Sequence, residues 1–356
     1  MSGRTAWSVV ASLAMAWGVA APGAAPPEWA KRDIKVGIIG TDTSHVPAFT
    51  RILHRHPEWR VRVVAAFPGG SPDLPASWNR VKKYAEVLRK QFGVEIVESI
   101  EALCAKVDGV MIESVDGRPH LAQARPVFAA RKPMFIDKPF TASLADARET
   151  VRLSRETGVP FFSSSCVRFQ PEVAKFRTNP GVGKLLKAQG SSPMHIEPHH
   201  PDLFWYGIHG VEALYTVMGR GCVAVSRKTA TFRYKTTVRR KVGGKEVVEQ
   251  VEKEGKADIT TGRWADGRIG VFRGVVSGPY LPLVKVWGTE GEAESKGGYN
   301  YEGLVEAIAR FFQTGKPPID PMETLEIIEF MTAAQLSKER GGAEVRLEEL
   351  RKEAAR

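Results

Sequence analysis

Residues 36–47 read V-G-I-I-G-T-D-T-S-H-V-P, and this stretch decides how the N-terminal half of the chain is interpreted. The apolar run that ends at Gly40 is typical of a strand that leads into a tight turn and a helix. Such a turn binds a dinucleotide when it reads G-x-G-x-x-G, because the second glycine lets the backbone approach the pyrophosphate and the third lets helix and strand pack closely. Here Asp42 and His45 take those two positions. The stretch predicts the fold of a dinucleotide-binding domain, with the phosphate-binding turn replaced.

The segment that follows alternates between apolar strand patterns and helical patterns. Residues 60–67 read R-V-R-V-V-A-A-F, which indicates a second strand. Residues 143–157 have helical spacing, with Ser143 as a possible cap and Gly158 as a stop. This alternation is typical of a parallel sheet covered by helices on both faces. We therefore predict a Rossmann-like, doubly wound α/β domain over residues 31–165.

The pattern changes after Cys166. Residues 221–290 are rich in β-branched side chains interrupted by turn signals, which predicts strands of a mostly antiparallel sheet. Two helical patterns close the chain, around residues 301–313 and 322–338. We predict a second domain over residues 166–356, an open and mostly antiparallel α/β domain.

The first 30 residues differ from the rest of the chain. Arg4 precedes an uncharged run from Ala6 to Ala21, which is shorter than the about 20 residues that cross a bilayer. A basic start, a short apolar run and small residues after it are typical of a secretory signal peptide. We expect residues 1–30 to be this signal and the protein to be exported, periplasmic or extracellular. An uncleaved membrane anchor is the alternative.

Composition excludes some partners. The formal net charge of the 356 residues is +11, but the basic residues are scattered and show no stripe interleaved with aromatics, so we predict no nucleic-acid partner. We also expect no membrane association once the signal is removed. The three cysteines, Cys104, Cys166 and Cys222, lack the spacing of a zinc or redox motif. Buried thiols are expected, and a disulfide between two of them is the alternative.

Four short stretches stand out by their order along the chain: V-G-I-I-G at 36–40, F-I-D-K-P at 135–139, G-I-H-G-V-E-A-L at 207–214 and K-V-W-G-T-E-G at 285–291. Together they resemble the Gfo/Idh/MocA family, named for glucose–fructose oxidoreductase and inositol dehydrogenase. The resemblance implies a Rossmann domain followed by an open sheet, NAD or NADP as cofactor, and oxidation or reduction of sugar or cyclitol hydroxyls. It also implies a possible homo-oligomer assembled through the open sheet.

The resemblance implies two catalytic residues. Lys138 corresponds to the lysine of the family's E-K-P motif, and Asp137 replaces the glutamate before it. An ammonium at that place can bond the reacting oxygen and move its proton. His209 corresponds to the family's histidine in the second domain, although Trp205 stands where the family has an aspartate.

The cofactor site is where the sequence departs from the family. A carboxylate at Asp42 lies close to where two phosphate charges would be, which is repulsive. Strand 60–67 ends in Phe67 without the acidic residue that would hold the adenosine ribose. The alternative is that Asp42 and His45 line a sugar or metal pocket. The candidate cofactor-binding residues are Gly40, Thr41, Asp42, Thr43, Ser44, His45, Asp137 and Lys138.

A histidine-rich segment, residues 194–209, precedes and includes His209. His195, Glu197 and His199 alternate, so on an extended segment they share a face and form a set of ligands suited to a divalent metal. The alternative is a polar substrate-binding loop without metal. The candidate substrate-binding residues are His120, Arg168, His199, Tyr206 and His209, with Tyr206 placed to stack on a sugar ring.

Three functions remain open from the sequence. The first is an exported Gfo/Idh/MocA-like oxidoreductase acting on a small carbohydrate with NAD or NADP. The second is a non-redox carbohydrate enzyme, a lyase or hydrolase, with or without a divalent metal. The third is a non-catalytic carbohydrate-binding protein on the same fold.

Overall fold

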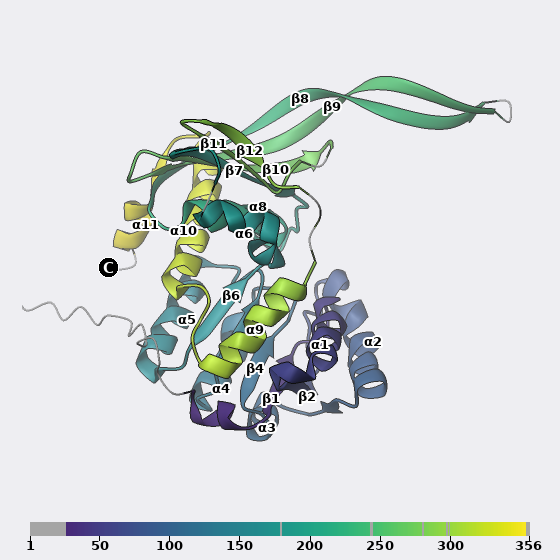
Figure 1. The fold of residues 1–356 in the computed structure, drawn as a ribbon, viewed down its shortest axis with the longest axis vertical. Coiled ribbons are helices and arrows are strands. Elements are labelled where there is room, and N and C mark those ends of the chain that lie inside the picture. The colour runs from purple at the N-terminus through teal and green to yellow at the C-terminus, as the bar shows by residue number, and fades with distance from the viewer. Residues whose placement is uncertain are drawn as a thin grey trace, which may run out of the picture.

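The computed structural model describes residues 26–178, 180–242, 245–279, 281–296, 298 and 300–353. Figure 1 shows a lower part built around one sheet and an upper part built around another. Most of the predicted signal peptide, residues 1–25, lies outside the described residues. Within those described ranges, none of the helices combines the length and apolar character needed to pass through a bilayer.

The first sheet has six parallel strands in the order β3-β2-β1-β4-β5-β6. Every residue of β4, β5 and β6 is buried, as expected for parallel strands covered on both faces. The doubly wound parallel sheet predicted from the sequence is therefore confirmed. The strands are β1 (Ile34–Ile39), β2 (Val61–Phe67), β3 (Glu95–Ile96), β4 (Gly109–Ile112), β5 (Met134–Asp137) and β6 (Phe161–Ser164).

Helices alternate with these strands along the chain. The hydroxyl of Ser143 accepts a hydrogen bond from the amide of Asp146, 3.1 Å away, and Gly158 ends the same helix with φ 68°. Both ends agree with the cap and stop read from the sequence. The helices are α1 (His45–Arg55), α2 (Pro75–Phe92), α3 (Ile100–Lys106), α4 (His120–Ala129) and α5 (Leu144–Thr157), with short 3-10 turns at Glu28–Lys31 and Pro57–Trp59.

The second sheet has seven strands in the order β12-β11-β7-β10-β9-β8-β13. All neighbouring pairs are antiparallel except β7 and β10, which confirms the mostly antiparallel sheet expected from the sequence. The strands are β7 (Leu185–Pro193), β8 (Cys222–Val242), β9 (Lys245–Trp264), β10 (Ile269–Ser277), β11 (Val284–Gly288), β12 (Gly291–Glu294) and β13 (Val345–Arg346).

The hairpin of β8 and β9 extends far beyond the rest of this sheet (Figure 1). Alternation along the two strands places the large apolar side chains on one face of the hairpin, called the apolar face, and leaves the other face charged. Arg239 and Glu246 form an ion pair on the charged face, whereas Arg240 and Glu249 pair on the apolar face. The apolar face also carries Phe232, Tyr234, Val238, Val247 and Val251.

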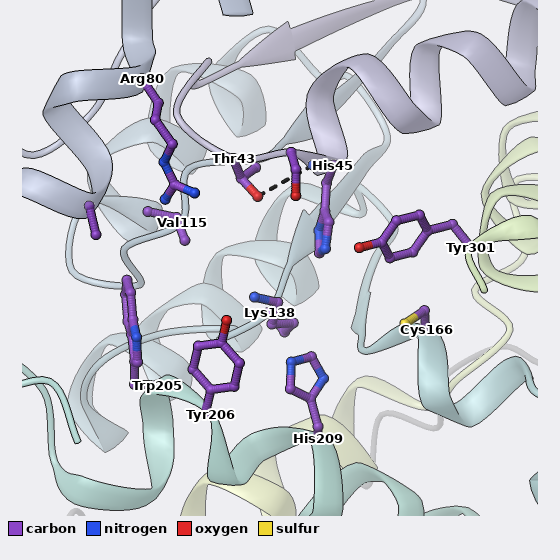
Figure 2. Close-up of a pocket in the computed structure, with 12 residues that line it drawn as sticks. Thr43, His45, Arg80, Val115, Lys138, Cys166, Trp205, Tyr206, His209 and Tyr301 are labelled. Atoms are coloured by element: carbon purple, nitrogen blue, oxygen red, sulfur yellow. Dashed lines mark hydrogen bonds between the residues drawn. The ribbon is translucent and has the colours of Figure 1, made fainter. Parts of the chain in front are cut away.

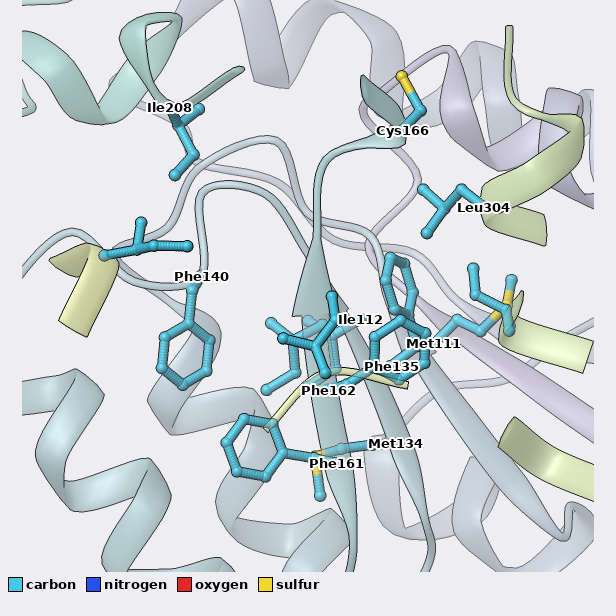
Figure 3. Close-up of a cluster of buried hydrophobic side chains, with 14 of the residues drawn as sticks. Met111, Ile112, Met134, Phe135, Phe140, Phe161, Phe162, Cys166, Ile208 and Leu304 are labelled. Atoms are coloured by element: carbon cyan, nitrogen blue, oxygen red, sulfur yellow. The ribbon is translucent and has the colours of Figure 1, made fainter. Parts of the chain in front are cut away.

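The remaining helices connect the two sheets. Helix α9 follows the second sheet in sequence but packs on the first, where Phe311 meets Phe162 edge-on at 5.1 Å between ring centroids. One continuous cluster of buried apolar side chains runs through both sheets, and Figure 3 shows its part around β4, β5 and β6. The helices and the 3-10 turn of this part are η3 (Cys166–Phe169), α6 (Pro171–Thr178), α7 (Asp202–Trp205), α8 (Gly207–Met218), α9 (Glu302–Thr314), α10 (Pro321–Glu339) and α11 (Leu347–Glu353).

The three cysteines are buried free thiols. Burial raises the pKa of Cys104 to about 11 and those of Cys166 and Cys222 to about 12. They are therefore uncharged and unreactive at neutral pH.

Candidate functional site

A cavity of about 240 Å³ lies where the carboxyl ends of the parallel strands face the second sheet's helices. One wall comes from the turn between β1 and α1, and the opposite wall from α7 and α8 (Figure 2). Ligand sites of open α/β sheets occur at this edge of the sheet. The lining includes Thr43, Ser44, His45, Arg80, Lys138, Trp205, Tyr206, His209 and Tyr301.

His45 and Asp137 form a buried pair at the floor of the cavity. Nδ1 of His45 lies 2.5 Å from Oδ2 of Asp137, and the other carboxylate oxygen accepts the amide of Lys138 at 2.7 Å. Burial opposes ionisation of Asp137, but the charge and hydrogen bond of His45, with Lys138, outweigh it and keep the pKa of Asp137 below its usual value. A carboxylate on Nδ1 fixes the ring and leaves Nε2 for the cavity. Phe49 stacks on the imidazole at 4.9 Å and limits its rotation.

Lys138 extends into the same cavity from the end of β5 and is only 8 % exposed. Its ammonium lies 6.0 Å from the centre of the Tyr206 ring, a cation–π contact. Figure 2 shows Lys138 between His45 above and Tyr206 and His209 below. The structure thus places the predicted catalytic lysine beside both histidines of the site.

His209 reaches the cavity from α8, where close packing on the second sheet sets its position. A Cβ added to Gly190 of β7 would come within 2.1 Å of the carbonyl oxygen of Gly210, so the helix approaches the strand as closely as backbone allows. Gly210 itself leaves no room for a side chain beside Phe272. The glycine after His209 therefore fixes the depth of the histidine in the cavity.

Ser165 is the partner of His209, and the sequence did not point to it. Its hydroxyl oxygen lies 2.6 Å from Nδ1 of His209 and accepts the amide of Val167 at 3.3 Å. With that amide donating to the oxygen, the hydroxyl hydrogen is available to Nδ1, which favours the imidazole that carries its own hydrogen on Nε2. Burial, helped by the charges of Lys138 and His45, lowers the pKa of His209 to about 3. His209 is therefore a neutral hydrogen-bond donor at physiological pH.

Asp42 does not face the cavity. Its carboxylate accepts the hydroxyl of Ser77 in α2 at 2.5 Å and the amide of Val115, after β4, at 3.0 Å. The side chain is fully buried, and burial raises its pKa despite these hydrogen bonds. Asp42 thus ties the turn after β1 to α2 and to the segment after β4. These are the segments between which a dinucleotide would lie in this fold.

The segment after β2 covers the same turn. The amide of Thr41 donates to the carbonyl oxygen of Gly69 at 3.0 Å, so it is not available to a phosphate. A Cβ on Gly70 would meet Ser77 at 2.7 Å and Asp42 at 3.3 Å, which shows how closely this segment packs on the turn. Asp73, the nearest acid after β2, forms an ion pair with Arg118. These contacts take the place of the phosphate-binding turn, as the sequence led us to infer.

Three candidate substrate-binding residues do not line the cavity, and two of them, His120 and Arg168, are buried in the interior. His120 is fully buried at the start of α4, with its ring nitrogens 3.0 and 2.9 Å from the carbonyl oxygens of Phe140 and Ser114. Arg168 is buried in η3, where it forms ion pairs with Glu212 and Glu323. Both residues have partners in the interior and do not line the cavity, so the structure gives their predicted substrate-binding role no support.

The candidate metal set is not assembled. His199 and Glu197 touch at 2.7 Å, but the ring of His195 packs edge-on against Tyr206 instead. Across the described ranges, no group of three or more His, Cys, Asp or Glu side chains is arranged to hold a metal ion. His199 also lies 3.7 Å from Asp73 and does not line the cavity, whereas Tyr206 does.

Arg80 is a second cavity residue that the sequence did not single out. It lies on α2 four residues after Ala76, so both face the cavity from one side of the helix. The sequence showed the helical spacing of Ala76 and Arg80, but it did not show that this face of the helix points to the cavity. The cavity is bounded there by Trp205, which packs with Leu74 and Val115.

The fold combines a Rossmann-type parallel sheet, which has the cavity at its carboxyl edge, with a second, mostly antiparallel sheet. Residues 34–165 match the GFO_IDH_MocA family model, described as an oxidoreductase family with an NAD-binding Rossmann fold. This part of the chain is therefore a Gfo/Idh/MocA-type domain, which confirms the resemblance expected from the sequence. None of the curated proteins searched matches the chain.

Solved structures of similar fold cover almost the whole chain. GenD2 from gentamicin A biosynthesis, in complex with NAD, is 18% identical, with a TM-score of 0.65 over 88% of this chain and 96% of that one. A putative myo-inositol dehydrogenase from Sinorhizobium meliloti 1021 is 14% identical, with a TM-score of 0.67 over 88% and 99%. An oxidoreductase from Agrobacterium radiobacter, in complex with NAD+, L-tartaric acid and magnesium, is 14% identical, with a TM-score of 0.66 over 89% and 99%. At these identities the likeness shows a shared fold.

The residues of this chain do not fit a dinucleotide in the usual position of the fold. Gly69 accepts the hydrogen bond of the Thr41 amide, and Gly70 packs on the turn. The Asp42 carboxylate joins the two sides of the groove through Ser77 and Val115. The open volume of about 240 Å³ is also below the about 300–1,000 Å³ usual for pockets that hold drug-sized ligands. The fold is that of an NAD-binding family, but the turn is closed by the chain itself.

Proposed function

We propose that this chain is an enzyme that carries out acid–base chemistry on a hydroxylated small molecule of the sugar or cyclitol type. The observation that carries the proposal is the His45–Asp137 pair, which faces Lys138 and His209 across one small cavity. A histidine oriented by a buried carboxylate is the arrangement of a general base. Tyr206 and Trp205 add aromatic surface suited to the apolar face of a sugar ring.

The geometry gives each polar group a separate role. His45 accepts a proton from the substrate through Nε2, while Asp137 holds the resulting imidazolium. The ammonium of Lys138 stabilises the negative charge that develops on a substrate oxygen. His209 donates a hydrogen bond from Nε2 and stays neutral, since its pKa is about 3. Together these groups suit removal of a proton from a hydroxyl or from a carbon beside a carbonyl, as in a lyase.

We propose that the reaction is non-redox, because Asp42, Gly69 and Gly70 close the groove that a dinucleotide would occupy. The second candidate is NAD- or NADP-dependent oxidation of a sugar or cyclitol. The family match over residues 34–165 and the NAD-bound and dehydrogenase relatives favour it. Lys138, His45 and His209 would take part in proton transfer in either reaction.

Two measurements on the purified chain separate the candidates. Calorimetric titration with NAD and NADP should give no binding, whereas candidate sugars and cyclitols incubated in D₂O should exchange protons or eliminate water, as followed by NMR. His45→Gln should abolish this exchange. His54→Gln on the same helix, whose ring bonds the carbonyl of Val63, should leave it intact. Binding of NAD or NADP, with reduction of the nucleotide by one of these compounds, would overturn the non-redox proposal.

The third candidate, a non-catalytic carbohydrate-binding protein, predicts a different pattern. Sugars would bind the cavity, but none would exchange protons or be converted. The paired His45 and Asp137 argue for catalysis, because a binding site has no need of a buried carboxylate oriented on an imidazole.

We also propose that the protein is exported. The support is the basic and apolar pattern at Arg4 and residues 6–21, which lies outside the described residues. N-terminal sequencing of the protein from fractionated cells tests this. Cleavage near residue 30 in a non-cytoplasmic fraction is expected, and an intact Met1 in the cytoplasm would contradict it.

A further inference from the structure

Arg80 presents an unpaired guanidinium to the cavity. It projects from α2 toward the space bounded by Val115 and Trp205 (Figure 2). Its Nε is buried and has no hydrogen-bond partner among the described residues. None of the described acidic side chains forms an ion pair with it, and the nearby Asp42 is already bonded to Ser77 and Val115. A buried guanidinium nitrogen without a hydrogen-bond partner is costly unless a ligand supplies one.

Lys138 adds a second positive charge to the same space. Its ammonium lies 6.0 Å from the centre of the Tyr206 ring, and its charge helps to lower the pKa of Asp137. The described residues that line the cavity include no carboxylate. Behind the lining, burial raises the pKa of Glu113 well above its usual value. Burial also raises the pKa of Asp42, and the charge of Arg80 acts on it in the opposite direction.

Asp137 is the one carboxylate next to the site whose pKa is kept low. The charge of Lys138 contributes to this low pKa, so the Asp137 carboxylate offsets the charge of Lys138. The buried Nε of Arg80 has no hydrogen-bond partner among the described residues. A ligand with a negatively charged group would supply that partner.

We infer that Arg80 binds a carboxylate of the substrate, so that the ligand class is a hydroxylated acid such as a sugar acid. The planar guanidinium can donate two parallel hydrogen bonds to a carboxylate, a geometry that a hydroxyl cannot match. Figure 2 shows Arg80 on one side of the cavity and His45, His209 and Tyr301 toward the other. The acid group is held at the Arg80 end, and the hydroxylated carbons reach the acid–base groups. This inference rests on the proposed function for the chemistry, but binding alone tests it.

The test compares matched sugars by calorimetry on the full-length mature chain. D-Glucuronate should bind at least about tenfold more tightly than D-glucose, because a charged hydrogen-bonded pair contributes that much or more. Arg80→Gln should remove most of this preference and leave the affinity for glucose unchanged. Arg89→Gln is the matched control, since Arg89 lies on the same helix but pairs with Glu86 on the surface. Thermal unfolding of each variant checks that it is folded.

Several results would overturn the inference. Equal affinity for glucuronate and glucose, no measurable binding of glucuronate, or an unchanged preference in Arg80→Gln would each do so. If glucose 6-phosphate bound more tightly than glucuronate and this binding depended on Arg80, the group recognised by Arg80 would be a phosphate and not a carboxylate. Arg80-dependent binding of NADP would assign the arginine to a nucleotide and would also overturn the non-redox proposal. Glucuronate that binds through Arg80 but undergoes no exchange in D₂O would support this site while contradicting the proposed catalysis.

Discussion

The hydroxyl of Ser165 lies 2.6 Å from Nδ1 of His209, so a neutral serine takes the place in which the family resemblance leads one to expect a carboxylate. A carboxylate would stabilise an imidazolium, whereas a hydroxyl only orients a neutral ring. The residue four positions before His209 is Trp205, which packs against Leu74 and Val115. The histidine is thus held as a donor of a hydrogen bond rather than as a base.

Ser165→Ala should therefore remove the preference of the His209 ring for one tautomer. In the wild type the ring is expected to carry its hydrogen on Nε2, and in the variant both tautomers should be populated. Nitrogen-15 NMR of the imidazoles at neutral pH measures this. His120, whose two ring nitrogens contact backbone carbonyls, gives an internal reference that should not change. An unchanged His209 signal would show that Ser165 does not set the tautomer.

The lowered pKa of His209 predicts a loss of stability in acid. The unfolded histidine binds a proton near its ordinary value of 6.5, but the folded one does so only near 3. Between these values the unfolded state binds more protons, so the free energy of unfolding falls as pH falls. We expect a contribution of about 1–3 kcal/mol between about pH 7 and about pH 4, with each pKa unit giving about 1.36 kcal/mol.

His209→Gln should remove that contribution. The difference in unfolding free energy between wild type and variant, measured by urea titration, should then shrink or reverse as the pH is lowered. A difference that is constant over this range would contradict the burial of a neutral imidazole.

Asp137→Asn should disable the proposed base without unfolding the protein. The amide keeps the volume of the side chain but cannot stabilise an imidazolium on His45, and it favours the wrong tautomer. We expect the rate of proton exchange of a bound sugar acid to fall by about 10²–10⁴, with little change in its affinity. Rates within a factor of two of wild type would show that the His45–Asp137 pair is structural.

Arg168 should prove essential for stability, since it is 4 % exposed and joins Glu212 to Glu323 in the interior. Arg168→Ala leaves two buried acids without their cation and should lower the free energy of unfolding by about 3–5 kcal/mol. Arg177→Ala is the matched control, because this arginine approaches Glu323 from the surface at 3.4 Å. Its loss should cost about 0–1 kcal/mol. Equal effects in urea titrations would contradict this assignment.

The projecting β8–β9 hairpin leads us to expect a homo-oligomer. A two-stranded hairpin is marginal alone, and the part that carries Val247 and Val251 projects beyond the rest of the sheet (Figure 1). Replacing both valines by glutamate should shift the mass measured by light scattering toward the monomer. Val248→Glu on the charged face, which is 57% exposed, should not. A monomeric wild-type chain would contradict the expectation.

Periodicity in the sequence was sufficient for most of the fold. The parallel sheet, the helix that begins after Ser143, and the closing helices near 301–313 and 322–338 follow from local apolar spacing, caps and stops. The long β8–β9 hairpin could not be foreseen, since alternation continues past the point where the core ends. Lys138 and His209 were found because each stands in a recognisable short motif.

What only the tertiary structure decided is the partner of each polar group. Asp42 and His45 occupy equivalent positions in one altered turn, yet Asp42 points inward to Ser77 and Val115, while His45 faces the cavity on Asp137. Ser165 and Arg80 lie at the site because of elements far away in sequence, whereas Arg168 and His120 lie in the interior. Residue type and spacing determine which face of a strand or helix a side chain lies on. Its neighbours depend on how those faces pack, and these neighbours set charge, tautomer and access to the ligand.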